Sequence, residues 1–101
     1  MASSTELTHP EQGAIVLEDV LFALSDPVRL DLVRQLRDGP MKAASCTALD
    51  PSLPKSTRSH TLKVLREAGV IHNAPEGRNR RLSLRRDDLD ARFPGLLDAV
   101  L

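Results

Sequence analysis

Short polar and cationic side chains gather between residues 55 and 63. This polar cluster consists of Lys55, Ser56, Thr57, Arg58, Ser59, His60 and Lys63. Hydroxyl and imidazole groups exchange hydrogen bonds with base edges and long cations bind phosphates, so the combination suits the major groove of DNA. A solvated helix face can have the same composition, and that is the competing interpretation.

A second group of cations follows and consists of Arg78, Arg80 and Arg81. It comes after a Pro-Glu-Gly turn sequence, and the residues beyond it alternate between polar and apolar side chains. We therefore predict a two-stranded hairpin in which Leu82 and Leu84 face inward and the three arginines occupy the tip and outer face. A basic hairpin placed directly after a groove-reading helix forms a wing that binds the phosphate backbone or the minor groove.

The charges are distributed unevenly along the chain. The 101 residues carry 14 Lys or Arg and 14 Asp or Glu, so the formal net charge is zero. Residues 54–86 contain nine Lys or Arg against two Glu, a net charge of +7, and the remainder has five against twelve, a net charge of −7. A basic stretch within a neutral chain predicts a surface that meets a polyanion on one side.

The polar cluster needs a helix that leaves it exposed. Residues 54–69 have a narrow apolar stripe that includes Leu62, Leu65 and Ala68, and they end at Gly69, where the backbone can take a positive φ. This pattern predicts a helix with one buried stripe. The opposite face then presents the cluster.

Two earlier segments complete a helix-turn-helix. Residues 25–38 begin with the helix-start sequence Ser-Asp-Pro and stop before Gly39-Pro40, which predicts a helix. We expect a short helix at residues 42–48 and then a turn before Pro54. A short helix, a tight connection and a longer helix with a polar leading edge form this motif.

The two ends of the chain carry the remaining elements. Residues 1–13 have no hydrophobic period and are expected to form a flexible N-terminal tail, which leaves residues 14–101 as the DNA-binding domain. Helices are expected at residues 15–24 and 87–101, the second interrupted at Pro94-Gly95. Both helices have more apolar surface than is needed to pack one face against the core of a single subunit. They are therefore the candidate dimer interface. The alternative is that they only close the core of one subunit.

Size and composition limit the class of protein. A chain of 101 residues forms one domain with a modest core, which favours a dimer. The N-terminal residues lack a basic flank and an apolar stretch of the secretory kind, and no apolar run is long enough to span a bilayer. We therefore expect a cytoplasmic protein without a membrane partner.

Cys46 is the only cysteine, which excludes an internal disulfide and a cysteine-rich zinc site within one chain. It has two interpretations: a small packed hydrophobe, or a redox-sensing thiol that requires exposure and a lowered pKa. Groupings of catalytic side chains and phosphate-binding glycine loops are missing from the sequence. We therefore expect neither an enzyme nor a cofactor or metal site.

Three stretches carry a family resemblance: LFALSDPVRLDLVRQL at 21–36, STRSHTLKVLREAGVI at 56–71 and EGRNRRLSL at 76–84. They resemble the ArsR family of bacterial winged helix-turn-helix repressors, also called ArsR/SmtB. The resemblance implies a mainly α fold with a small β-hairpin, dimerised through its N- and C-terminal helices. It also implies a homodimer that represses transcription at double-stranded operator DNA until an inducer lowers its affinity.

The chain departs from the family in its metal ligands. Family members that sense metals often carry paired cysteines before the recognition helix, where this chain has only Cys46, or histidines in the last helix, where residues 87–101 have none. The resemblance therefore does not identify the inducer. Two alternatives stay open: a winged-helix module that binds an acidic protein surface, and a redox sensor of the same fold that uses Cys46.

Overall fold

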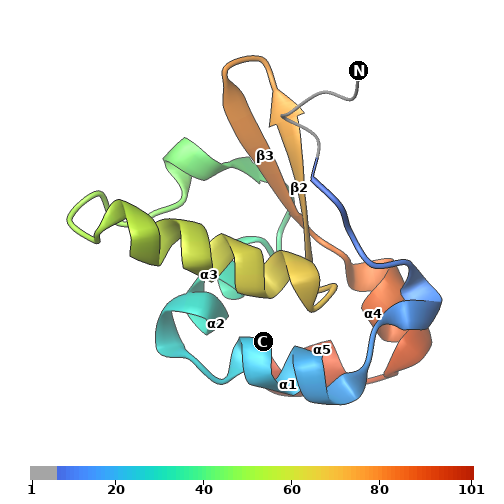
Figure 1. Cartoon of the computed structure of the whole chain (residues 1–101). Coiled ribbons are helices and arrows are strands. Elements are labelled where there is room, and N and C mark those ends of the chain that lie inside the picture. The colour runs from blue at the N-terminus through green and yellow to red at the C-terminus, as the bar shows by residue number, and fades with distance from the viewer. Residues whose placement is uncertain (1–6) are drawn as a thin grey trace.

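A computed structural model of the chain describes residues 7–101 (Figure 1). The described residues form five α-helices, two single turns of 3-10 helix and three strands. Their order is η1 Gln12–Ala14, α1 Leu17–Leu24, α2 Pro27–Gln35, β1 Met41–Lys42, η2 Ala43–Ser45, α3 Lys55–Glu67, β2 Ile71–Glu76, β3 Asn79–Leu84, α4 Arg86–Arg92 and α5 Leu96–Val100. None of these helices is long and apolar enough to cross a membrane.

The predicted start of α2 is confirmed. The Asp26 carboxylate accepts hydrogen bonds from the backbone N–H groups of Val28 and Arg29 at 3.0 and 3.1 Å. Pro27 is the first residue of the helix, where its missing N–H leaves no hydrogen bond unmade. This capped helix packs against both α1 and α3. Helix α2 therefore helps to fix the position of the longer helix α3.

The helix predicted over residues 54–69 is α3, and it lies across the middle of the molecule between the hairpin and the helices below (Figure 1). Leu65 is fully buried, and Thr61 and Ala68 lie beside the same core. After the helix, Gly69 has a φ of +85° and turns the chain into β2. A Cβ at Gly69 would lie 2.5 Å from Cγ1 of Ile15, so the junction has room only for glycine.

The predicted hairpin is confirmed as β2 and β3, but the sheet contains a third strand. The strand order is β1-β3-β2, and all pairs are antiparallel. Met41 and Lys42 pair with Leu82 and Arg81 of β3, which holds this segment extended. The short helix predicted at residues 42–48 is therefore wrong, and a single 3-10 turn follows β1 in its place.

The last predicted helix is interrupted where proline and glycine suggested. Helix α4 ends at Arg92, and α5 begins after Gly95, whose φ is +85°. Leu89 of α4 and Leu97 of α5 are fully buried, so both halves contribute to the core. The first predicted helix is shorter than expected. It begins at Leu17, and Ile15 is buried ahead of it in an extended conformation.

Residues 7–13 differ from the flexible tail that their composition suggested. Residues 1–6 of that expected tail lie outside the described residues. The backbone carbonyls of Thr8 and Pro10 accept hydrogen bonds from Arg66 and Arg85 at 2.6 and 2.7 Å. The segment therefore lies against α3 and the sheet, held by side chains that come from far along the chain.

Candidate nucleic-acid interface

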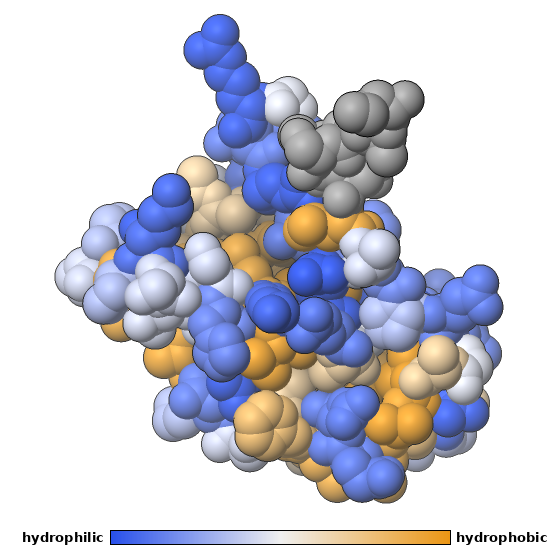
Figure 2. Space-filling model, in the orientation of Figure 1, coloured by the Kyte–Doolittle hydropathy of each residue, from blue (hydrophilic) through white to orange (hydrophobic). Residues whose placement is uncertain are grey.

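The polar cluster lies on the exposed side of α3, as the apolar stripe predicted. Six of its side chains are exposed and Arg58 is half-buried. Within residues 7–101, none of the seven side chains makes a hydrogen bond or an ion pair. Figure 2 shows hydrophilic surface over α3 and at the tip of the hairpin. These side chains are therefore available to an external partner.

Arg58 is the member of the cluster with a distinctive environment. Its Nε atom is enclosed and has no hydrogen-bond partner among the described residues. A hollow of about 380 Å³ lies beside it between α3 and the preceding loop, and Pro51 and Lys55 also line this hollow. A buried donor without a partner costs free energy, so Arg58 gains from an acceptor supplied by a ligand.

The start of α3 adds backbone donors next to the cluster. The helix follows Pro54 and has no side-chain cap among the described residues. Its first backbone N–H groups therefore lack intrahelical acceptors. Together with the positive end of the helix dipole and Lys55, they favour an anion such as a phosphate.

The arginines of the hairpin differ in their surroundings. Arg78 is exposed at the turn. Arg81 is exposed and pairs with Glu76 of the opposite strand at 3.2 Å. Arg80 does not lie on the outer face, so that expectation is wrong. Arg80 lies two residues before the buried Leu82 in β3, and alternate residues of a strand face the same side. Arg80 therefore lies on the inner face of the hairpin.

The inner position of Arg80 is explained by a buried partner. Its Nε donates to Oδ1 of Asn73 at 2.8 Å, and its Nη2 donates to the Asn73 carbonyl at 3.0 Å. Asn73 is 5% exposed. The sequence contained a signal for Asn73, because alternation from the buried Ile71 places it inward. Its pairing with Arg80 had no sequence signal.

The structure brings the helix and the hairpin to one side of the molecule. A hollow of about 300 Å³ lies between α3 and β2, and its walls include Ser59 and Lys63 of the polar cluster and Asn73 of the hairpin. Because Asn73 also binds Arg80, the polar cluster and this arginine of the hairpin are neighbours in space. A long polyanion can contact both of them at once.

Cys46 is buried, with 3% of its surface exposed. Its Sγ lies 3.2 Å from Oε1 of Gln35 and donates a weak hydrogen bond to it. Burial is the main cause that raises the pKa of the thiol, and the nearby Asp31 raises it further. A reactive thiol needs the opposite conditions, so the environment favours the packed interpretation. Among residues 7–101, no group of three or more His, Cys, Asp or Glu side chains could hold a metal ion.

An exposed polar helix after a short helical turn, followed by a basic antiparallel hairpin, defines a winged helix-turn-helix protein. A family model described as a helix-turn-helix domain matches residues 24–73, from the end of α1 into β2.

Similar proteins identify the family of the chain more closely than the domain model does. The chain is 35% identical over 96 residues to the uncharacterized HTH-type transcriptional regulator YceK of Bacillus subtilis strain 168, covering 93% of this chain and 95% of that protein. Its fold matches the crystal structure of an ArsR family transcriptional regulator with a TM-score of 0.66, 22% identity, and coverage of 88% and 92%. It matches the structure of a possible transcriptional regulator for arsenical resistance with a TM-score of 0.63, 32% identity, and coverage of 83% and 84%.

The chain therefore belongs to the ArsR family of winged helix-turn-helix transcriptional regulators. The predicted family and fold class are confirmed. Members of this family are DNA-binding regulators and not enzymes.

Proposed function

We propose that the protein is a homodimeric cytoplasmic repressor that binds double-stranded operator DNA and leaves it when an inducer binds. The observation that carries this proposal is the set of unbonded polar side chains on α3, next to a basic hairpin on the same side of the molecule. Burial of Cys46 disfavours the thiol as the sensor. We therefore propose that the inducer acts on a group other than this thiol.

Two roles are proposed for the interface. Arg58 and His60 read base edges, because both lie within the first two turns of α3, which enter the major groove first. Phosphates are bound by Lys55 and Lys63. The hydroxyl groups of Ser56, Thr57 and Ser59 serve either bases or phosphates.

The hairpin completes the proposed interface. Arg78, Arg80 and Arg81 bind the DNA backbone, since long cations on a wing meet phosphates irrespective of base sequence.

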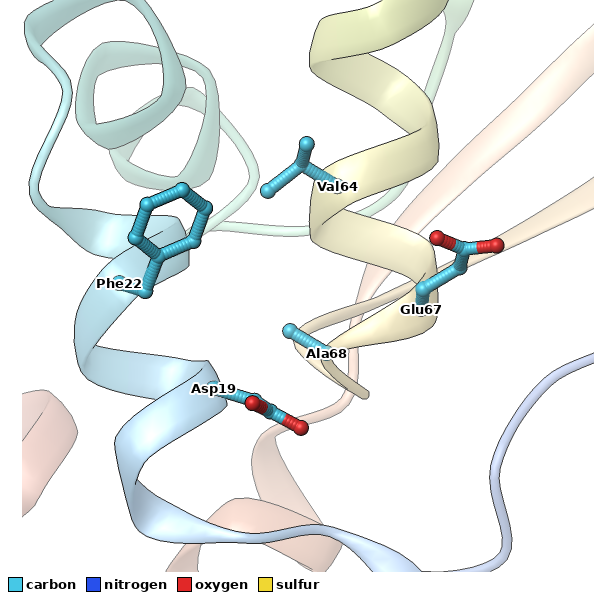
Figure 3. A pocket seen from close by; sticks show the side chains of 5 residues that line it. All are labelled: Asp19, Phe22, Val64, Glu67 and Ala68. Atoms are coloured by element: carbon cyan, nitrogen blue, oxygen red, sulfur yellow. The ribbon is translucent and has the colours of Figure 1, made fainter.

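The proposed dimer interface centres on α1. Among residues 7–101, the exposed large hydrophobic side chains all belong to this helix or to the residue before it: Val16 at 41%, Leu17 at 40%, Leu21 at 48% and Phe22 at 62%. Figure 3 shows Phe22 of α1 facing Val64 of α3 across a hollow of about 240 Å³. An apolar strip beside an open hollow is suited to a second copy of the same strip, as two-fold symmetry requires. On α5, Leu97 is buried and its apolar neighbours are partly buried, so α5 contributes less.

A titration with DNA tests the proposal. Duplexes selected from a random library by the protein should contain an inverted repeat with half-sites about one helical turn apart. Affinity should fall by about 1,000-fold or more between roughly 50 and 200 mM salt. Equal affinity for selected and random duplexes would instead favour a module that binds an acidic protein surface.

The dimer requires its own measurement. Phe22→Glu should convert the protein to a monomer in sedimentation experiments and weaken binding to the inverted repeat more than to a half-site. Glu18→Gln, on the same helix, is the matched control and should leave the dimer intact. A wild-type protein that sediments as a monomer at the concentrations that saturate DNA would contradict the homodimer.

A further inference from the structure

Residues 7–10 form a segment, here called the N-terminal strap, that lies along the outer edge of the hairpin. Strand β2 is an edge strand, because the strand order is β1-β3-β2. The backbone N–H of Asn73 in this strand donates to Nε2 of His9 at 3.0 Å. The strap is also held by Arg66 of α3 and by Arg85 after β3. It thus connects three elements of the domain.

The strap is linked through Asn73 to an arginine of the hairpin. Asn73 binds His9 with its backbone N–H, and it binds Arg80 with its carbonyl and its side-chain oxygen. One buried residue therefore joins the strap to the guanidinium. A displacement of Asn73 changes the two hydrogen bonds through which this residue holds Arg80.

The strap also lies next to the exposed side of α3. Leu7 lines the same hollow of about 300 Å³ as Ser59 and Lys63 of the polar cluster. Its position is therefore beside the surface to which we assign DNA, and not on the opposite side of the domain.

We propose that His9 and Asn73 are positioning residues for DNA binding, which hold Arg80 of the hairpin in the orientation that meets a phosphate. This inference rests on the proposed function. Neither residue needs to touch DNA. Their effect is to hold one cation in place before binding, so that less conformational freedom is lost when the complex forms.

The proposal requires His9 to be neutral, because only an unprotonated Nε2 accepts from the Asn73 N–H. The ring of His72 in β2 stacks on His9 with 4.2 Å between centroids. The arginines beside it are Arg66 from α3 and Arg85, which itself pairs with Asp88 of α4 at 3.0 Å.

These neighbours favour the neutral form of His9. Burial is the largest cause that lowers the pKa of His9 below its ordinary value of 6.5, and His72, Arg66 and Arg85 lower it further. The pKa of His9 is thus lower with the strap docked than with it free. Docking is strongest above pH 6.5 and weakens as the pH falls below that value.

Two variants of His9 test the inference with a random-sequence duplex at low salt. His9→Ala should lower affinity about fivefold, the effect of one lost hydrogen bond. His9→Gln should bind like the wild type, because its side-chain amide supplies an acceptor near the place of Nε2 and does not titrate. Wild-type affinity in His9→Ala, or equal losses in both variants, would overturn the proposal.

A double-variant cycle shows whether His9 acts through Arg80. In the Arg80→Ala background, His9→Ala should have no further effect on affinity. An undiminished loss in that background would overturn the role of His9 as a positioning residue. If Arg80→Ala weakens DNA binding while His9→Ala does not, the inference fails and the proposed function stands.

Two further measurements separate positioning from direct contact. Below pH 6.5, wild-type affinity should fall relative to His9→Gln. A relative rise would mean that the His9 imidazolium meets phosphate directly. Amide exchange of Asn73 should be faster in His9→Ala than in His9→Gln, even in a protein that binds no duplex. Unchanged exchange would overturn the contact on which the proposal depends. Failure to bind any duplex would refute the proposed function and, with it, the role of His9 in DNA binding, while the contact measured by amide exchange would still stand.

Discussion

The two basic regions of this protein, α3 and the β2–β3 hairpin, have similar charge but opposite organisation. On α3, the seven side chains of the polar cluster make no hydrogen bond with any residue that the structure describes. On the hairpin, Arg81 pairs with Glu76 and Arg80 is held by the buried Asn73. The side chains of α3 are unbonded before DNA arrives, whereas two of the three hairpin arginines, Arg80 and Arg81, are already held by neighbours.

This difference has a physical meaning for recognition. Side chains that read bases must adopt geometry dictated by the sequence in the groove, so it is useful that they have no competing partners. Cations that bind the backbone meet the same phosphate spacing at every site, so a fixed orientation reduces the entropy lost on binding. We therefore expect α3 to determine specificity and the hairpin to add general affinity.

The largest expected effect comes from the joint between the two regions. Gly69→Ala places a side chain at a φ of +85° and 2.5 Å from Ile15, which should destabilise the fold by about 2 kcal/mol. For a chain of this size that is roughly 8–16 °C in the melting temperature.

Gly77→Ala is the control for that change. Its φ is +61° but nothing lies within 4 Å of the added Cβ, so it should lower the melting temperature less. Thermal unfolding of both variants followed by circular dichroism decides the matter. A smaller loss for Gly69→Ala than for Gly77→Ala would mean that the junction with Ile15 is not tightly packed.

The next effect concerns specificity. Arg58→Ala and His60→Ala should each reduce the preference for selected duplex over random duplex about tenfold, because each removes contacts to base edges. Affinity for random duplex should change less. Glu67→Gln, near the end of the same helix and outside the cluster, is the matched control and should keep the preference. Fluorescence anisotropy with both duplexes measures it, and a uniform loss for both would reverse the roles of helix and hairpin.

A smaller effect is expected at the hairpin. Arg81→Ala should weaken binding to every duplex about two- to threefold and lower the slope of log affinity against log salt by about one. Glu76→Gln removes the carboxylate that competes for Arg81, so it should strengthen binding. Titrations at several salt concentrations compare the two. Changes in the same direction would show that the ion pair helps to form the interface.

The smallest effect is expected at Cys46, away from both regions. Cys46→Ser retains a donor toward Gln35, so DNA affinity and its response to oxidant should stay as in the wild type. Because burial raises the pKa of the thiol, alkylation near neutral pH should be slower in the folded than in the unfolded protein. An oxidant that releases the wild type but not Cys46→Ser would restore the redox interpretation.

Local patterns in the sequence determined most of the architecture. The Asp26-Pro27 start of α2, the glycine after α3 and the alternation of Leu82 each depend on neighbours within a few residues, so they could be predicted from the chain alone. The position of the polar cluster on the exposed side of α3 followed from the same period. These features require only that a helix or strand bury its apolar side.

Contacts between distant residues decided the rest. Met41 pairs with Leu82, so the start of the segment predicted as a helix is a strand. Arg80 donates a hydrogen bond to Asn73 and therefore lies on the inner face of the hairpin. The docking of His9 on Asn73 joins residues 64 positions apart in the chain and has no local signal. A hydrogen bond of this kind depends on where two backbones meet, and only the folded chain determines that position.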